Sequence, residues 1–399
     1  MTRVDIDRIG TRGDGMGNDA GKTVVIAKTL PGETVEVTNG RLSGILKASP
    51  DRIAAFCKFY DTCGGCKFQH WSLAPYAAWK RQLVIDSLKS QGLDVNVGEL
   101  MDAHGLGRRR VSLHVRQIEG VWHAGFMEAR THDLVVIDVC PVLDPKLQDA
   151  FAIAAAFGPM MGACDVAITA ADNGLDVAVK AEREAVGKRI AAFNELMARF
   201  NIARVSVNGE VAAQDRVPQV SVGRANVPLP VQSFLQATAL GEQTLVDLVR
   251  EPLVKSRKII DLFCGVGPFT FRIAETHKVH GIDLDKAAIA GMLHAARFST
   301  GLKPLTAEAR DLYDNPLVPA ELNEYDTVVM DPPRAGAEAQ ARNLAKSKVK
   351  TVISVACDVL SFARDAAILV RGGYHLVKVT PVDQFKYTAH VEMVGVFRR

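Results

Sequence analysis

The chain has 399 residues, a formal net charge of +3 and seven cysteines. Its length exceeds one ordinary domain of about 100–200 residues, which predicts two or three domains. No stretch approaches the roughly 18 apolar residues of a membrane span, and the opening MTRVDIDRIG lacks a signal peptide's apolar core, so we expect a soluble cytoplasmic protein with no membrane partner. An odd number of unevenly spaced cysteines argues against a disulfide framework and for metal or nucleophile chemistry.

Residues 1–50 predict a small β-barrel. Short β-type runs (TVVIAKTL, ETVEV and SGILKAS) alternate there with turn sequences such as RGDGMGNDAGK. Barrels of this size often bind oligonucleotides, so this region is a candidate RNA-binding module.

A central region over 51–230 opens with three clustered cysteines in AFCKFYDTCGGCKFQH, and a fourth follows in VVIDVCPVLDP. Cys57, Cys63, Cys66 and Cys140 can complete a tetrahedral set for zinc or for an iron–sulfur cluster. Zinc sites more often pair two Cys-x-x-Cys units and only one is present, while a cysteine before proline favours iron–sulfur. Zinc and simple packing of the thiols remain the alternatives.

The rest of the central region predicts a mostly antiparallel α+β domain, because strand-like runs over 107–230 mix with two helical stretches. An earlier helix over 74–90 is a candidate to pack on the catalytic domain. Basic residues gather in GRRRVSLHVR, where four arginines form either a solvated face or a surface that follows an RNA backbone. They are Arg108, Arg109, Arg110 and Arg116.

From residue 231 onward the pattern predicts a doubly wound, largely parallel sheet. A helix over 236–250 precedes IIDLFCGVGPFT, and apolar strands then alternate with helices. The strands are VHGIDL, DTVVMD, TVISVA and YHLVKVTPV, and the clearest helix is DKAAIAGMLHAARFS. The expected class is therefore α/β, with a Rossmann-like domain over 231–399.

The loop in IIDLFCGVGPFT predicts a nucleoside site. Gly265 and Gly267 allow a tight turn and close approach of a ligand, although glycines also mark ordinary turns. Asp283 follows the next strand, where it can bond ribose hydroxyls, and the missing third glycine favours S-adenosylmethionine over a dinucleotide. Asp311 and Asp331 also end strands, with solvated loop carboxylates as the alternative for each acid.

Cys357 follows the strand TVISVA, and Glu392 interrupts the apolar run in YTAHVEMVGVF. The simplest alternatives are a core cysteine and an edge-strand acid that faces water; Cys164 and Cys264 are interpreted as a core residue and a small loop residue. A thiolate and a base beside a methyl donor suit methylation at C5 of a pyrimidine. Cys357 would add to C6, C5 would attack the methyl group, and Glu392 would remove the C5 proton.

These segments resemble the RNA 5-methyluridine methyltransferases, which modify uracil in ribosomal or transfer RNA. The resemblance covers about residues 1–399 and rests on CKFYDTCGGC, QSFLQ, DLFCGVGPFT, DPPRAGA, SVACD and AHVE, in the family's order. It implies a class I S-adenosylmethionine-dependent methyltransferase with nucleophile Cys357, base Glu392 and a [4Fe-4S] cluster on the four cysteines. It also implies donor contacts at Gln236, Phe263, Asp283, Asp311 and Asp331, beside the loop glycine Gly265.

The family usually has Asn-Pro after the nucleophile, whereas Asp358 and Val359 stand here, and a negative charge beside a thiol raises its pKa. Pro268 and Asp311 likewise replace usual asparagines. We expect a monomer that acts on ribosomal RNA. The alternatives are the same reaction on transfer RNA, a cytosine methyltransferase, and a catalytically silent iron–sulfur protein that binds RNA.

Overall fold

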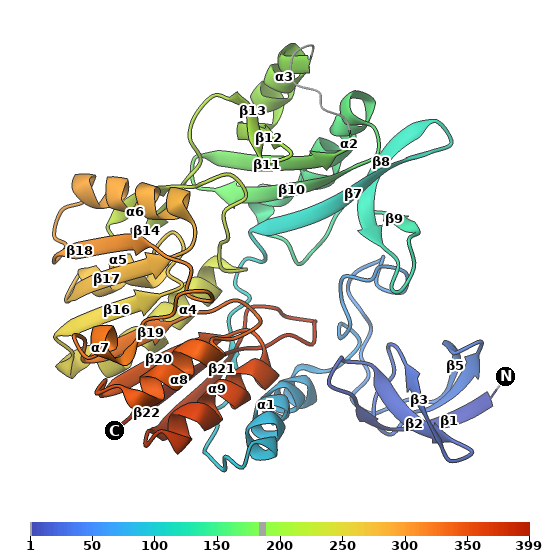
Figure 1. Ribbon diagram of the computed structural model, residues 1–399. Helices are drawn as coiled ribbons and strands as arrows, with labels where there is room; N and C mark the ends of the chain where they lie inside the picture. The colour runs from blue at the N-terminus through green and yellow to red at the C-terminus, as the bar shows by residue number, and fades with distance from the viewer. Residues whose placement is uncertain (1, 183–188) are drawn as a thin grey trace.

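The computed structural model describes residues 2–182 and 189–399. Its strands form three large sheets and one hairpin, and each large sheet has its own buried hydrophobic cluster. In Figure 1 the N-terminal sheet lies at the lower right, the central sheet at the top and the largest sheet at the lower left. No helix among the described residues is long and apolar enough to cross a membrane.

The N-terminal region is a five-stranded antiparallel sheet with the order β3-β2-β1-β4-β5. Its strands are β1 (Thr2–Ile9), β2 (Gly15–Asp19), β3 (Lys22–Ile26), β4 (Thr34–Thr38) and β5 (Arg41–Lys47). Val4 and Ile6 of β1 are buried, whereas Arg3 and Asp5 are exposed. That alternation gives the sheet one apolar face, which is how so short a segment forms a core.

The central sheet has the order β13-β12-β11-β10-β7-β8-β9 and is antiparallel except between β11 and β12. Its strands are β7 (Arg110–Ile118), β8 (Val121–Met127), β9 (Leu134–Val136), β10 (Cys164–Ala171), β11 (Gly174–Ala181), β12 (Ile202–Val207) and β13 (Glu210–Gln214). Helices α2 (Ala150–Met161) and α3 (Ile190–Phe200) pack on it, with Phe157 and Phe193 fully buried. The predicted α+β region is confirmed.

The largest sheet has the order β18-β17-β16-β19-β20-β22-β21-β6. Its first five strands are parallel and β22 runs antiparallel to both of its neighbours, which is a Rossmann-like sheet as predicted. The strands are β16 (Lys258–Leu262), β17 (Lys278–Asp283), β18 (Leu305–Ala309), β19 (Thr327–Met330), β20 (Thr351–Ala356), β21 (His375–Asp383), β22 (Glu392–Arg398) and β6 (Met101–Asp102). Its helices are α4 (Ala239–Arg250), α5 (Pro268–Ala274), α6 (Lys286–Phe298), α7 (Pro319–Leu322), α8 (Glu338–Lys346) and α9 (Val359–Arg371).

Helix α4 begins at Ala239 rather than at residue 236, because the Thr238 hydroxyl accepts a hydrogen bond from the Gly241 N–H (2.9 Å) and caps the helix there. The segment before the cap is extended and carries Gln236 to the sheet. A hairpin of β14 (Gln219–Val222) and β15 (Ala225–Pro228) lies between the central and largest sheets along the chain.

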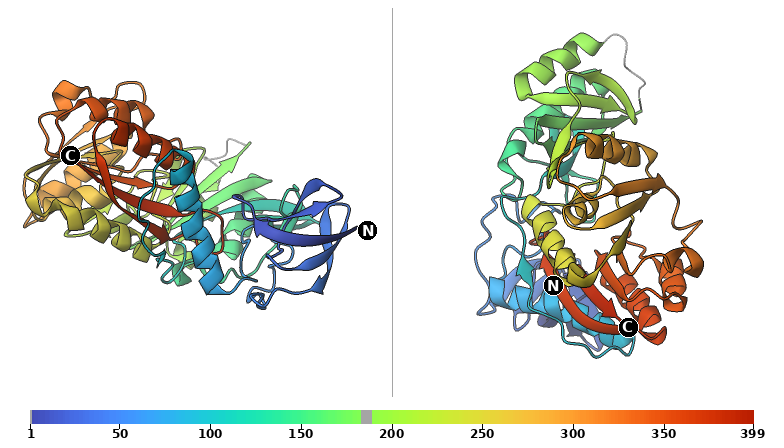
Figure 2. Two further views of the ribbon diagram at one scale, coloured as in Figure 1. Left: turned by 90° about the horizontal axis from the view of Figure 1, so that it is seen from below. Right: turned by 90° about the vertical axis from the view of Figure 1, so that its left-hand side faces the viewer.

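Helix α1 (Leu73–Ser90) packs against α9 and β21, and β6 adds to the edge of the largest sheet beside β21. This stretch of the expected central domain is therefore part of the catalytic domain in space. Figure 2 shows α1 between the largest sheet and the N-terminal sheet. The helix thus connects the cysteine-rich segment that precedes it to the strands that end the chain.

Candidate active site

The loop after β16 adopts an unusual backbone. Phe263, Gly265 and Gly267 have φ angles of 62°, 54° and 85°, so three residues in five lie in the left-handed region. A Cβ at Gly267 would lie 2.6 Å from the Met292 sulfur, which is closer than real side chains approach. The tight turn directs the Gly265 N–H to Asp283, whose Oδ2 accepts it at 2.8 Å.

A cavity of about 60 Å³ lies beside this loop, at the carboxyl ends of the parallel strands. Gln236, Phe263, Gly265 and Asp331 line it together with the exposed ring of Phe234. Gln236 and Asp331 are also bonded to each other, because the Gln236 amide donates to Asp331 Oδ2 at 2.9 Å. Strand ends in open α/β sheets are where ligands bind, so these four predicted donor residues are gathered at a ligand site.

The remaining two predicted donor residues lie beside the cavity rather than in its lining. Asp283 accepts from the Gly265 and Asp285 N–H groups, so both of its oxygens are already engaged. Asp311 Oδ1 accepts from the Tyr313 N–H at 2.8 Å and holds the turn after β18. The Tyr313 ring lies 5.6 Å from that of Phe263, and this neighbour of the site was missed because nothing in its spacing marks it.

Cys357 and Glu392 come from adjacent antiparallel strands. Ala356, the last residue of β20, pairs with Met393 of β22, so Cys357 and Glu392 meet at the same end of the ladder. Glu392 is 4% exposed, so the alternative of an edge acid facing water is wrong. Cys357 is half-buried, which leaves its thiol open to one side.

The ionisable groups of the site raise one another's pKa values. Burial raises the pKa of Glu392, and the nearby Asp331 carboxylate raises it further. Burial also raises the pKa of Cys357 to about 12, with added contributions from Glu392, Asp331 and Asp358. Both groups therefore favour the protonated form when no substrate is present, so each must lose its proton before it can act as a nucleophile or a base.

Gln384 is a buried residue of the candidate site that the sequence did not indicate. It is fully buried, its amide donates to Gln236 Oε1 at 2.8 Å, and its own oxygen accepts from the Ala237 N–H at 2.9 Å. It also lies beside the Glu392 carboxyl and lowers the pKa of that group. One amide thus lies between the donor cavity and Glu392.

Asp358, the residue after Cys357, has a structural role. Its Oδ1 accepts from the N–H groups of Leu360 and Ser361, both at 3.1 Å, and so caps helix α9. Its Oδ2 lies 3.3 Å from the Arg334 guanidinium. The helix N-terminus and this cation stabilise the negative charge beside the thiol.

The four predicted cluster cysteines line one cavity of about 130 Å³, although Cys140 comes from a distant part of the chain. Phe126 and Ile137 make part of its wall apolar. Among residues 2–182 and 189–399, no three His, Cys, Asp or Glu side chains are placed to hold a single metal ion. By contrast, Cys164 and Cys264 are buried elsewhere, in agreement with their interpretation as core and loop residues.

The arginines of GRRRVSLHVR differ from one another. Arg109 is largely buried, bonds the Gln236 carbonyl at 2.8 Å and pairs with Glu242, so neither predicted alternative applies to it. Arg110 lines the cysteine cavity, and Arg108 donates to the Lys386 carbonyl at 3.5 Å. Arg109 and Arg116 both form ion pairs, and Arg116 is the more exposed of the two. Its guanidinium lies 3.7 Å from the Asp165 carboxylate.

Comparison with known proteins agrees with this geometry. A family model described as a methyltransferase domain matches residues 253–364. An uncharacterized RNA methyltransferase of Brucella suis is 41% identical over 100% of this chain and 98% of its own. The 23S rRNA (uracil(1939)-C(5))-methyltransferase RlmD of Chromohalobacter salexigens is 32% identical over 99% of this chain and 89% of its own. The chain belongs to the RNA 5-methyluridine methyltransferase family.

A solved structure supports the fold over the same length. The tRNA (uracil-54, C5)-methyltransferase of Pyrococcus abyssi, in complex with S-adenosyl-L-homocysteine, superimposes with a TM-score of 0.74. It covers 99% of this chain and 100% of its own at 21% identity. The predicted class I methyltransferase fold is confirmed, and the family makes this protein an enzyme that uses S-adenosylmethionine.

Proposed function

We propose that this protein methylates C5 of a uridine in ribosomal RNA, with S-adenosylmethionine as the methyl donor. The observation that carries the proposal is the meeting of Cys357 and Glu392 at one end of the β20–β22 ladder. Asp331, which lines the donor cavity, lies close enough to raise the pKa of both groups. Nucleophile, base and methyl donor therefore share one site, which is what methylation of a weakly nucleophilic carbon requires.

The chemistry balances with these two side chains. The Cys357 thiol first releases its proton to solvent. The thiolate then bonds to C6 of uracil, and the electron pair of the C5=C6 bond is displaced into an enolate. C5 then takes the methyl group, and the donor leaves as S-adenosylhomocysteine. Glu392 removes the proton from C5, and the resulting electron pair expels the thiolate from C6. The product is 5-methyluridine, and the enzyme is regenerated when Glu392 loses its proton.

We further propose that Cys57, Cys63, Cys66 and Cys140 hold a [4Fe-4S] cluster. Four thiols line one partly apolar cavity, which fits the usual Cys₄ ligand set. Each thiolate of such a cluster binds a different iron, so the four sulfurs need not converge on one point as tetrahedral zinc requires. When bound, the cluster would hold the 57–66 segment against Cys140 and could exchange electrons.

Ribosomal RNA is favoured over transfer RNA because the relative named for 23S rRNA is 32% identical, whereas the one named for tRNA is 21% identical and informs on the fold alone. One chain holds the donor cavity, nucleophile and base, so we propose that it acts as a monomer in the cytoplasm. The proposed domains are residues 1–50, 51–230 and 231–399, with α1 attached to the last.

Labelled S-adenosylmethionine, total RNA and nucleoside digestion test the proposal. We expect labelled 5-methyluridine from the wild type and none from Cys357→Ala. Glu392→Gln should transfer the methyl group once and then remain bound, because the C5 proton blocks elimination. It should therefore appear crosslinked to RNA on a denaturing gel.

An RNA that carries 5-fluorouridine should trap the wild type in the same way, because fluorine cannot be removed as a proton. RNA binding without methylation by the wild type would favour the silent binding protein instead. Labelled 5-methylcytidine would favour the cytosine enzyme, and 5-methyluridine confined to transfer RNA would correct the proposed substrate.

A further inference from the structure

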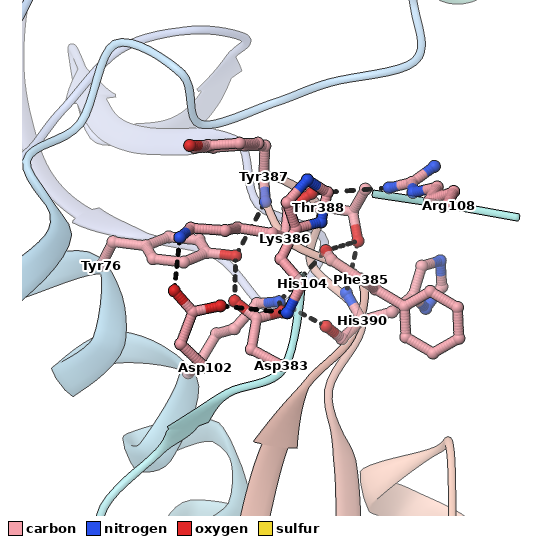
Figure 3. Close-up of polar contacts among 11 residues, drawn as sticks. Tyr76, Asp102, His104, Arg108, Asp383, Phe385, Lys386, Tyr387, Thr388 and His390 are labelled. Atoms are coloured by element: carbon pink, nitrogen blue, oxygen red, sulfur yellow. Dashed lines mark hydrogen bonds and ion pairs between the residues drawn. The ribbon is translucent and has the colours of Figure 1, made fainter. Parts of the chain in front are cut away.

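The loop that precedes Glu392 is held from below by a buried lysine. Residues 384–391 join β21 to β22, and the loop returns the chain to the base. Lys80 of α1 lies beneath this loop with its side chain fully buried. Figure 3 shows the neighbouring side chains of Tyr76 and Asp383 close to the loop residues.

The Lys80 ammonium contacts both ends of the loop. Its Nζ lies 2.5 Å from Asp383 Oδ1, directly before the loop, and donates to the carbonyl of His390, near the end of the loop, at 2.6 Å. The Phe385 carbonyl accepts a third, longer bond at 3.4 Å. A lysine ammonium has three hydrogen-bond donors, and all three are used here on residues at the two ends of the loop.

Tyr76, one helical turn before Lys80, extends the same network into the tip of the loop. Its hydroxyl donates to Asp383 Oδ2 at 2.8 Å and accepts from the Tyr387 N–H at 2.9 Å (Figure 3). Tyr387 has a φ of 66°, which is strained for a residue with a side chain. The Lys67 N–H bonds the Tyr387 carbonyl at 2.7 Å, so the tip is held from the cysteine segment as well.

A charged pair at this depth is not needed for stability alone. Burial lowers the pKa of Lys80 to about 8, because the effect of desolvation outweighs that of the adjacent Asp383 carboxylate. Apolar residues of similar volume often replace such pairs with no loss of stability. The geometry therefore indicates a role that an apolar side chain could not perform, namely bonding two carbonyls and a carboxylate at fixed places.

The position of the loop decides what that role is. His390 is two residues before Glu392, and Gln384, directly after Asp383, lies beside the Glu392 carboxyl and lowers its pKa. Of the two residues that Lys80 joins, one is therefore close to Glu392 along the chain and the other adjoins the amide beside it. We propose that Lys80 is a positioning residue for Glu392, which closes the β21–β22 loop so that the carboxylate lies against C5 of the uridine. This inference rests on the proposed function.

Lys80→Met tests it, because methionine keeps the length of the side chain and removes the three donors. The methylated, Cys357-linked RNA should form but resolve slowly, so the adduct accumulates on a denaturing gel. We expect turnover to fall by about a hundredfold, the cost of misplacing a catalytic group by roughly 1 Å. Donor affinity should stay within about twofold, because Lys80 does not line the donor cavity.

Two further variants separate positioning from folding. Lys89→Met removes an exposed lysine from the same helix and should behave as wild type. Lys80→Met/Asp383→Asn removes both charges, so it should regain thermal stability while its adduct still resolves slowly. Recovery of turnover in this double variant would show that Lys80 only neutralises Asp383, and would overturn the proposal even if Lys80→Met alone fails to fold.

The outcomes also separate this inference from the proposed function. A wild type that makes no 5-methyluridine and no adduct contradicts the proposed function. A wild type that makes 5-methyluridine, beside a folded Lys80→Met that turns over normally, contradicts the positioning role alone. Loss of adduct formation in folded Lys80→Met would place its effect before methyl transfer and likewise contradict that role.

Discussion

The Gln384 side-chain amide donates a 2.8 Å hydrogen bond to the side-chain oxygen of Gln236. Gln236 in turn bonds Asp331, and Gln384 also lies beside the Glu392 carboxyl. A buried hydrogen-bonded chain therefore runs from the donor cavity to Gln384, next to the proposed base. Because buried polar groups are costly when a partner is lost, the members of such a chain affect one another.

Gln384→Leu should weaken both donor binding and stability. The substitution leaves the Ala237 N–H and the Gln236 oxygen without their partner, and each unsatisfied buried group costs about 1–3 kcal/mol. We expect donor affinity, measured by calorimetry, to fall at least tenfold. Gln243→Leu is the matched control, because Gln243 is exposed and bonds only Asp247 of its own helix. Equal donor affinity in the two variants would show that this hydrogen-bonded network does not support donor binding.

The raised pKa of Glu392 predicts how its replacement depends on pH. The folded protein keeps this carboxyl protonated at pH values where the unfolded chain, with a pKa of about 4.3, has released the proton. The group therefore lowers stability increasingly as pH rises above that value. Glu392→Gln lacks this penalty. In urea titrations, its free energy of unfolding relative to that of the wild type should therefore increase between about pH 5 and pH 8. A difference in unfolding free energy that does not change with pH would mean that the pKa of Glu392 is not shifted.

Arg109→Ala and Arg116→Ala should differ in their effects on RNA binding. Arg109 bonds the Gln236 carbonyl and pairs with buried Glu242, so its loss should lower stability and donor affinity while the salt dependence of RNA binding is unchanged. Arg116 is partly exposed, and if it contacts a phosphate its loss flattens the slope of log affinity against log salt by about 0.7. Filter binding at several salt concentrations measures both slopes. An unchanged slope for Arg116→Ala would make it a solvated surface residue.

Cys140→Ser should reduce bound iron and sulfide in protein that is reconstituted without oxygen. Its thiol faces the same cavity as those of Cys57, Cys63 and Cys66, so three ligands would remain. Cys164→Ser is the control, because Cys164 is buried in the central sheet and does not line that cavity. Iron and sulfide analysis and visible absorbance measure the difference. Stoichiometric zinc without iron in the wild type would contradict the proposal that these cysteines hold an iron–sulfur cluster.

Local sequence was sufficient to predict most elements that carry a motif, although Gln236 lies on an extended segment before α4 and not on the helix. The strand before the glycine loop, the helix that begins after Asp285 and the strand that ends before Cys357 all follow from apolar runs bounded by glycine or by a capping acid. The donor residues at strand ends were predictable for the same reason. Asp311 shows the limit, because its carboxylate bonds the following turn and its chain position cannot reveal that.

The residues that orient the site were not predictable. Gln384 and Lys80 have no motif of their own, and their partners are 148 and 303 residues away along the chain. Arg109 looked like one of a basic group, yet it lies against Gln236 and Glu242. The role of such a side chain depends on the residues that contact it. Contacts between residues so far apart along the chain depend on the whole fold.

The sequence by itself determined the class of sheet and the family, and it indicated Cys357 and Glu392 as the proposed nucleophile and base, because periodicity and reactive side chains are local properties. Only the tertiary structure decided that Cys57, Cys63, Cys66 and Cys140 face one cavity, and that Asp331 lies close enough to Glu392 to raise its pKa. It also decided that α1 lies beneath the β21–β22 loop. The physical reason is that burial and electrostatic interaction depend on distance in space, which the order of residues along the chain does not specify.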